Sequence, residues 1–298
     1  MAYEIFGEDT VTPHRLHTLL RLVARLEKAT RKDLQNLLQP SEIGLLNQDT
    51  SSNVLKAARN LGLIMENEDK TISLTMAKEL IETVEAYKNY LRNTFLGKTI
   101  EEHPNYLLNL FIAWYAVQNE KVFSNYRIDR DYAAEINRQL FPNVTPQRYD
   151  EKVIIGNARD WTAFLGLGWM MRYDRPGSGR VIFVPDATER LEALLPELLP
   201  LGSQMRFVDF LRRLAEHCPE LDGGKLFNYC WDICNKGQPR GNNLSLILSN
   251  GLRGLRDLDK IELLRQADAT DNWQLYPAYG DRNGDRNNEV THIRRGEN

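Results

Sequence analysis

The residues that could hold a metal ion are grouped between positions 217 and 234. They are His217, Cys218, Cys230 and Cys234. A structural zinc site normally contains cysteines separated by two residues, and the chain has no such pair. Cys230 and Cys234 are instead one helical turn apart on an apolar face, where free cysteines pack as small hydrophobic groups. We therefore expect the cysteines in the core, with no metal and no other cofactor.

Two other patterns could carry chemistry, and each has a simpler interpretation. His14 and His17 are three residues apart without carboxylate partners nearby, so we expect both at the surface of a helix. The glycine-rich segment 176–179 lies between two apolar segments, whereas a phosphate-binding loop is followed by a helix. It is predicted to be a hairpin tip. Since no hydrolase, kinase or metalloprotease motif occurs, we expect that the chain is not an enzyme and has no small-molecule substrate.

The remaining chemistry is hydrogen bonding and charge from Ser, Asn, Lys and Arg side chains on three predicted helices and one predicted hairpin. Such groups donate to phosphates and to base edges. The alternatives are a solvated helix surface or a protein-docking surface. The helix predicted at 151–165 also offers Lys152, Asn157 and Thr162. The candidate nucleic-acid-binding residues are Ser51, Ser52, Asn53, Lys56, Arg59, Arg159, Arg172, Arg175, Arg180, Arg240, Asn242, Asn243, Ser245, Ser249, Arg253 and Arg256.

The overall charge of the chain is not that of a strongly basic nucleic-acid-binding protein. The 298 residues carry a net charge of −3, with 42% hydrophobic and 27% charged residues. Nucleic-acid binders often have a basic surplus, so any basic surface must come from local arrangement. The hairpin turn predicted at 66–70 is acidic and would repel a DNA backbone, whereas residues 172–180 carry three arginines and one aspartate.

The elements that must position these side chains follow a definite order at the start of the chain. Three helices are predicted, and Gly62 fits the left-handed residue that ends the third helix. Two alternating strands then enclose a polar turn, and residues 76–95 continue as a long amphipathic helix. The predicted helices cover residues 13–26, 30–38 and 50–61, and the strands cover 63–65 and 71–74.

The same order recurs twice. Leu61-Gly62-Leu63 reappears as Leu165-Gly166-Leu167, 104 residues later. A third copy has Asp259 in the glycine position, and Asp tolerates the left-handed conformation better than most residues. The predicted hairpin strands of these copies cover 169–172 with 181–184, and 261–264 with 273–276.

Three helices followed by a hairpin resemble the winged-helix superfamily, in which the third helix enters a DNA groove. The residues that carry this resemblance are 58–64, 164–167 and 255–261. We therefore expect a mainly α (α+β) fold of three tandem winged-helix domains, joined by a long linking helix. The expected domains are 1–96 with linking helix 76–95, 97–200 and 201–277, followed by a flexible tail at 278–298.

In length and layout the whole chain is also similar to DpdG-type proteins of bacterial DNA-modification and defence clusters that handle 7-deazapurine bases. This resemblance implies an accessory protein that acts with a larger ATPase or nuclease. No catalytic residue is carried over, because no motif of the chain supports one.

The preferred hypothesis is a non-enzymatic tandem winged-helix protein that contacts duplex DNA within a larger assembly, because several weak sites together raise avidity. One alternative is a protein–protein adaptor, like the winged-helix subunits of SMC-type ATPase complexes. Another is a transcriptional regulator. The sparse cysteines, the absence of an apolar leader and the absence of a long apolar run predict a cytoplasmic protein without a membrane segment.

Overall fold

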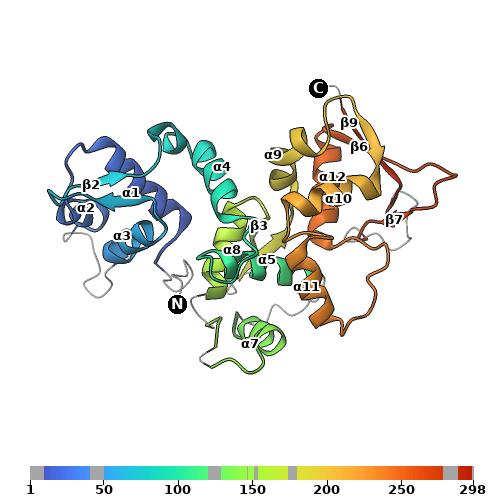
Figure 1. The fold of residues 1–298 in the computed structure, drawn as a ribbon, viewed down its shortest axis with the longest axis horizontal. Coiled ribbons are helices and arrows are strands. Elements are labelled where there is room, and N and C mark those ends of the chain that lie inside the picture. Colours follow the sequence, from blue (N-terminus) through green and yellow to red (C-terminus); the bar gives the residue numbers. More distant parts are fainter. Residues whose placement is uncertain are drawn as a thin grey trace.

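A computed structural model of the chain describes residues 10–40, 50–119, 129–145, 147–150, 154–173, 180–277 and 288–296. The fold is mainly helical, with small antiparallel sheets (Figure 1). The N-terminal elements α1 to α3 lie at one end of the molecule. Helix α4 joins them to the middle and C-terminal elements at the other end (Figure 1).

The N-terminal unit has the predicted order of elements. Thr12 and Thr30 cap the first two helices through their side chains, and Asp33 completes a capping box with Thr30. Such boxes satisfy amide groups that a helix start leaves without partners. The elements are α1 (Pro13–Arg25), α2 (Arg31–Leu38), α3 (Thr50–Asn60) and the antiparallel strands β1 (Ile64–Glu66) and β2 (Ile72–Leu74).

The predicted linking helix over 76–95 is divided in two, so this expectation was wrong. The short 3-10 helix η2 (Lys78–Ile81) comes first, and α4 (Val84–Phe95) follows. The break falls at Thr83, which has an extended backbone, and its side chain accepts a hydrogen bond from the Ala86 amide at 3.0 Å. The prediction of one helix followed the apolar periodicity, which runs through both pieces. The break occurs because Thr83 caps the start of a new helix.

The middle unit is organised around a buried helix, α5, whose residues are apolar nearly all round, as predicted. After the β-strand pair comes a helix, α9, that was not predicted. The elements are α5 (Tyr106–Gln118), α7 (Asp129–Leu140), α8 (Ile154–Phe164), β3 (Gly168–Tyr173), β4 (Arg180–Pro185) and α9 (Thr188–Leu198).

The described part of the C-terminal unit contains three helices, but its strands do not pair as predicted. The expected hairpin of 261–264 with 273–276 was wrong, because β6 pairs with β9 and β7 pairs with β8. The elements are β5 (Gln204–Arg206), α10 (Phe207–His217), α11 (Lys225–Cys234), α12 (Leu246–Asp257), β6 (Ile261–Leu264), β7 (Trp273–Gln274), β8 (Glu289–Val290) and β9 (His292–Arg295).

The end of the chain therefore differs from the flexible tail expected over 278–298. Strand β9 lies at the centre of a three-stranded sheet with the order β5-β9-β6. Val290 of β8 and Ile293 of β9 are both fully buried. Few apolar side chains are needed to order these strands, because neighbouring strands satisfy the hydrogen bonds of their backbone amides and carbonyls. The predicted boundaries near residues 96 and 200 stay predictions.

The three helix ends that carry the repeated sequence signature share one geometry. Gly62, Gly166 and Asp259 have φ values of 68°, 81° and 55°. In each case this residue's amide donates to the carbonyl three positions earlier, and the next amide donates to the carbonyl five positions earlier, at 2.9–3.0 Å. This pair of bonds is the Schellman motif. The same stop signal therefore precedes β1, β3 and β6.

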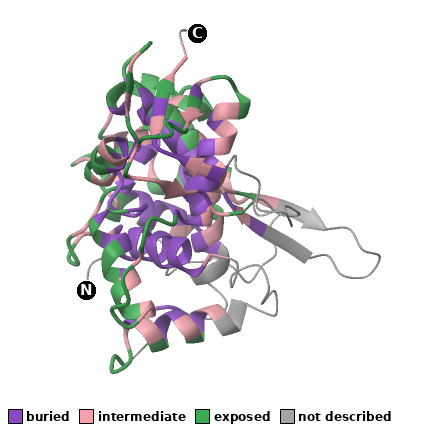
Figure 2. Ribbon diagram, turned by 90° about the vertical axis from the view of Figure 1, so that its right-hand side faces the viewer, coloured by how far each residue is buried: buried purple, intermediate pink, exposed green. Residues whose placement is uncertain are grey.

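The middle and C-terminal units are joined by close packing of α9 on α12. A side chain at Gly251 would come within 2.9 Å of the Ala187 backbone, and one at Gly254 would overlap Thr188. The two glycines thus allow the helices to approach each other. Leu191 of α9 and Leu252 and Leu255 of α12 are buried, and buried residues occupy the middle of the molecule in Figure 2.

The two histidines of α1 differ in burial. His14 is exposed, as predicted. His17 is buried, and its Nε2 lies 2.8 Å from the Ile81 carbonyl, so the prediction that it lies at the surface was wrong. The 3-10 helix η2 covers this face of α1. Of the helices that the structure describes, none has the length and apolar character to cross a bilayer.

Candidate nucleic-acid interface

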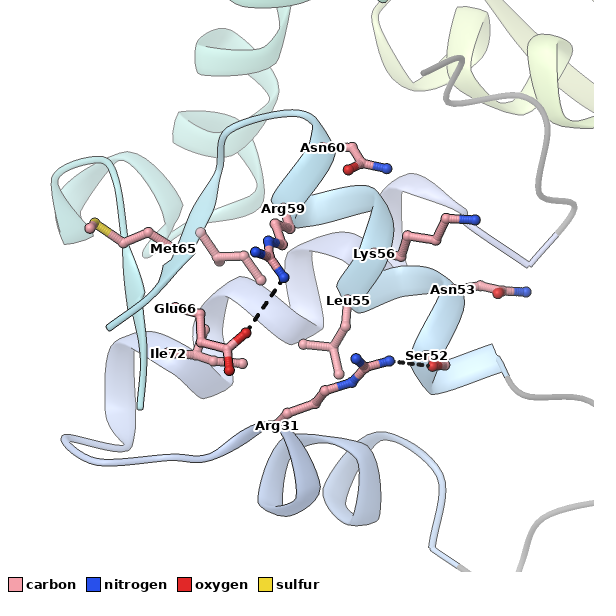
Figure 3. Close-up of a pocket in the computed structure, with 11 residues that line it drawn as sticks. Arg31, Ser52, Asn53, Leu55, Lys56, Arg59, Asn60, Met65, Glu66 and Ile72 are labelled. Atoms are coloured by element: carbon pink, nitrogen blue, oxygen red, sulfur yellow. Dashed lines mark hydrogen bonds and ion pairs between the residues drawn. The ribbon is translucent and has the colours of Figure 1, made fainter. Parts of the chain in front are cut away.

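The strongest candidate surface is a groove between α2, α3 and the β1–β2 hairpin (Figure 3). Its volume is about 480 Å³. The apolar residues Val54, Leu55 and Ala58 bury one side of α3, and this fixes the opposite side toward solvent. Lys56, Arg59 and Asn60 consequently line the groove with exposed side chains.

Hydrogen bonds fix the polar residues at the start of α3. Arg31 of α2 donates to the Ser52 hydroxyl at 2.9 Å (Figure 3). The Gln35 amide donates to the same hydroxyl at 3.3 Å, and Asn53 donates to the Thr10 hydroxyl at 3.3 Å. Ser52 and Asn53 are half-buried as a result. These predicted residues do lie at the groove.

Arg59 faces the hairpin across the groove. Its Nη1 lies 3.5 Å from the Glu66 carboxylate (Figure 3), while its side chain remains 66% exposed. Ion pairs at such exposure contribute at most about 1 kcal/mol. A phosphate can therefore compete with Glu66 for this guanidinium at little cost.

The charges of the groove and of the hairpin tip are opposite. Arg31, Lys56 and Arg59 outnumber the single carboxylate, Glu66, among the lining residues. At the tip, two hydrogen bonds from Thr71 lower the pKa of the Asp69 carboxyl, so the tip stays negative at neutral pH. An anionic ligand is thus favoured on the helix side of the hairpin.

Ser51 does not belong to this surface. It is buried, and its amide donates to the Gln39 side chain at 3.2 Å. The prediction that Ser51 faces outward was wrong because residue 51 lies on the packed side of the first turn of α3.

The candidates of the middle unit are described only in part. Arg159 is half-buried on α8. Arg172 and Arg180 belong to the paired strands β3 and β4, but their side chains lie outside the described residues, as does all of Arg175. The nucleic-acid role of these arginines stays a prediction.

The other outward positions expected on α8 were wrong where the structure describes them. Asn157 and Thr162 are buried, and the Thr162 hydroxyl donates to the Ala158 carbonyl at 2.6 Å. Lys152 lies outside the described residues. Helix α8 packs against α1 and α5 as well as β3. Because neighbours cover it on several sides, fewer of its residues face solvent than in a helix that packs on one side only.

Several candidates of the C-terminal unit are bound inside the protein. Ser245 is buried and caps α12, and its hydroxyl and amide bond to the buried Asp222. Arg240 forms an ion pair with the same carboxylate. The expectation that Ser245 and Arg240 present free donors to a ligand was therefore wrong, because Asp222 engages both.

Ser249 and Arg253 are covered by the chain that follows α12. The buried Ser249 hydroxyl accepts a hydrogen bond from the Tyr276 amide at 2.8 Å. Arg253 donates to the Tyr276 carbonyl at 2.5 Å and to the Asn288 side chain at 2.8 Å. The predicted basic face of α12 is wrong at these positions, since they fix β7 and β8 to the helix.

Three candidates of this unit remain accessible. Asn242 and Asn243 are exposed, and the Asn242 side chain donates to the Asn272 carbonyl at 3.0 Å. Arg256 has a 41% exposed side chain and pairs with Asp257 at 2.9 Å. None of the three lines the α3 groove. Arg31 and Asn60 were not predicted as site residues, although both line the α3 groove. Their place there depends on how α2 and the end of α3 face the hairpin.

The cysteines contribute to packing. Cys218 and Cys230 are fully buried, as expected, and burial raises the pKa of the Cys218 thiol to about 12. Cys234 donates to the Gln139 side chain at 3.1 Å. Among the described residues, no three His, Cys, Asp or Glu side chains meet as metal ligands would.

The fold and groove define a mainly helical protein with small antiparallel sheets and a local basic surface. A family model described as DpdG-like matches residues 5–269. This match covers most of the chain, which therefore belongs to the DpdG-like family. Neither the curated proteins nor the solved structures provide a match.

Proposed function

We propose that the chain is a non-enzymatic, cytoplasmic component of a DNA-modification or defence assembly that contacts duplex DNA through the α3 groove. Membership of the DpdG-like family supports a role in a DNA-modification cluster. The proposal includes a winged-helix arrangement, which is supported by the order α1-α2-α3-β1-β2 and by the three Schellman ends. Its partners are DNA and a larger ATPase or nuclease.

The observation that carries the proposal is the concentration of cations on one groove of an acidic chain. Arg31, Lys56 and Arg59 come from two helices and line the same hollow, whereas the chain has a net charge of −3. Arginine and lysine side chains dominate contacts to DNA phosphates, and Asn60 supplies an amide of the kind that reads base edges.

The test is duplex binding by the full chain, measured as fluorescence anisotropy from about 50 to about 300 mM salt. The variant Lys56→Glu with Arg59→Glu should weaken binding by more than about tenfold. It should also make the salt dependence shallower by about one unit for each lost phosphate contact. The matched control is Arg138→Glu with Arg212→Glu, which changes the net charge equally at two exposed sites away from the groove.

Equal loss in both double variants would show that only the total charge matters, and the groove assignment would be abandoned. Reversal of Arg253 is unsuitable as a test because that side chain holds β7 and β8. Its loss would disturb the fold as well as any DNA contact.

The adaptor alternative has one observation in its favour. Tyr229 and Ile233 lie on successive turns of α11 and are 44% and 37% exposed. Contiguous exposed apolar patches mark protein contacts, whereas single exposed apolar side chains are ordinary. If the chain binds no duplex at the lowest salt, co-purification of a larger ATPase or nuclease with the tagged full chain becomes the deciding measurement. A transcriptional regulator would instead require preference for a particular sequence.

A further inference from the structure

A separate hollow of about 360 Å³ lies in the C-terminal unit, between α11, the start of α12 and β7. It shares no lining residue with the α3 groove. Its walls combine aromatic rings, one arginine and amide side chains. The volume falls within the range of about 300–1,000 Å³ that is typical of small-molecule sites.

One wall is a stack of planar groups. Phe227 and Trp231 are one turn apart on α11, and their rings are 15° from parallel with centroids 6.3 Å apart. The Arg240 guanidinium carbon lies 4.6 Å from the Phe227 centroid and 6.0 Å from the Trp231 centroid. Aromatic rings and guanidinium planes are the surfaces on which proteins stack unpaired bases.

The guanidinium of Arg240 is held in place before any ligand arrives. It pairs with the buried Asp222, and its Nε donates to the Asn243 carbonyl at 3.0 Å. Burial lowers the pKa of Arg240 to about 10, so the group stays charged at neutral pH. A charged plane that is already ordered loses little conformational freedom when a ring stacks on it.

The edge of the hollow carries amide groups that can donate and accept. Asn243 and Gln274 both line it. The backbone of Gln274 is fixed because its amide donates to the Asn242 carbonyl at 2.8 Å and its carbonyl accepts from Leu244 at 2.9 Å. Asn and Gln side chains recognise the paired donors and acceptors on the edges of bases.

We propose that this hollow binds an unpaired nucleobase, which stacks against Arg240 and Trp231 and bonds at its edge to Asn243 and Gln274. The base belongs either to a free nucleotide or to single-stranded DNA. This site goes beyond the duplex contact proposed for α3, because an intact duplex keeps its bases stacked and inaccessible to such a hollow.

The experiment uses the full chain and three probes. These are deoxyadenosine monophosphate, a short labelled single-stranded oligodeoxynucleotide, and an abasic oligonucleotide of equal length. Binding is followed by tryptophan fluorescence for the nucleotide and by anisotropy for the strands. We expect the nucleotide or the base-containing strand to bind, and the abasic strand to bind at least about tenfold more weakly than the base-containing strand, because the base faces supply the stacking.

Two variants locate the site. Trp231→Leu keeps an apolar side chain but removes the ring, and Asn243→Leu removes an exposed amide without touching the backbone carbonyl that Arg240 uses. Each should weaken binding by about tenfold, the first through lost stacking and the second through lost hydrogen bonds to the base edge. The matched control is Tyr229→Leu, on the same helix but outside the hollow, which should bind as the unmodified chain does.

The outcomes are decisive in each direction. Binding of the mononucleotide identifies a free nucleotide as a ligand, and binding of the strand alone identifies single-stranded DNA. Unchanged binding in a folded Asn243→Leu and a folded Trp231→Leu, equal binding of the abasic strand, or no binding of any probe overturns the proposal. Failure here is separable from failure at α3, because Trp231→Leu should retain duplex binding and the Lys56→Glu, Arg59→Glu variant should retain nucleotide binding.

Discussion

Arg92 on α4 donates a hydrogen bond to Oε2 of Glu189 on α9 at 2.6 Å, although the two residues are 97 positions apart. The same guanidinium donates through Nε to the Leu165 carbonyl at 3.0 Å, and Lys88 also pairs with Glu189. Helix α4 is therefore fixed to the middle unit. The α3 groove is consequently presented in a set orientation relative to the rest of the protein.

Replacing this arginine should lower stability. Arg92→Met keeps much of the buried stem but leaves the Leu165 carbonyl without its charged donor, so we expect a loss of about 1.5–3 kcal/mol in the free energy of unfolding. Urea unfolding followed by circular dichroism measures it. The same substitution at Arg138, whose ion pair with Glu135 is exposed, should change stability by less than about 0.5 kcal/mol. Equal effects at both sites would contradict the structural role of Arg92.

A second prediction separates backbone strain from packing at equivalent helix ends. Gly62→Ala introduces a side chain where nothing lies within 4 Å, so only the positive φ opposes it, at a cost of about 1–2 kcal/mol. At Gly166 the new Cβ would meet Arg92 at 2.7 Å and Glu189 at 2.8 Å. We therefore expect Gly166→Ala to cost at least about 1 kcal/mol more. Thermal unfolding of both variants tests this, and equal losses would show that Arg92 and Glu189 move aside freely.

The sequence predicts those parts of the fold that depend on neighbours along the chain. Helix α1 follows from apolar spacing, α2 from its capping threonine, and α5 from its nearly unbroken apolar sequence. The Schellman ends at Gly62, Gly166 and Asp259 follow from local residue types. Strand pairing is different, because β6 and β9 join residues about 30 positions apart. Their partners depend on which backbone groups the helices leave uncovered.

The candidate site residues likewise fall into those that the local sequence predicts correctly and those whose exposure depends on distant segments. Lys56 and Arg59 face solvent as predicted, because Val54, Leu55 and Ala58 set the rotation of α3. On α12 the local pattern is equally clear, yet residues 273–276 and 288 fold over Ser249 and Arg253. Periodicity along one helix carries no information about a distant segment that covers it.

The third helix end offers a stabilising change. Asp259 has φ 55° in the position that glycine holds in the other two Schellman motifs. Asp259→Gly relieves this strain, although glycine gains freedom in the unfolded chain, so we expect a net gain of about 0.5 kcal/mol. Differential scanning calorimetry should show a higher Tm. The matched control, Asp257→Gly, is at the last residue of α12 and should lower stability by about 0.3 kcal/mol. A fall in Tm for Asp259→Gly would contradict this account.

The buried His17 should make stability depend on pH. Its Nε2 donates to the Ile81 carbonyl at 2.8 Å, its ring stacks on Tyr87 at 4.5 Å, and burial lowers its pKa below 6.5. A lowered histidine pKa means that the folded protein prefers the neutral ring. This contribution is complete above about pH 6.5 and is lost as the pH falls through 6.5 toward the folded-state pKa.

We therefore expect the free energy of unfolding to fall between about pH 7 and pH 5, and to fall less steeply in His17→Gln, which can still donate to Ile81 but does not titrate. Urea unfolding at several pH values measures the slope, and NMR titration of the His17 ring gives its pKa directly. A midpoint above 6.5, or an unchanged slope in the variant, would show that His17 does not favour its neutral form in the folded protein.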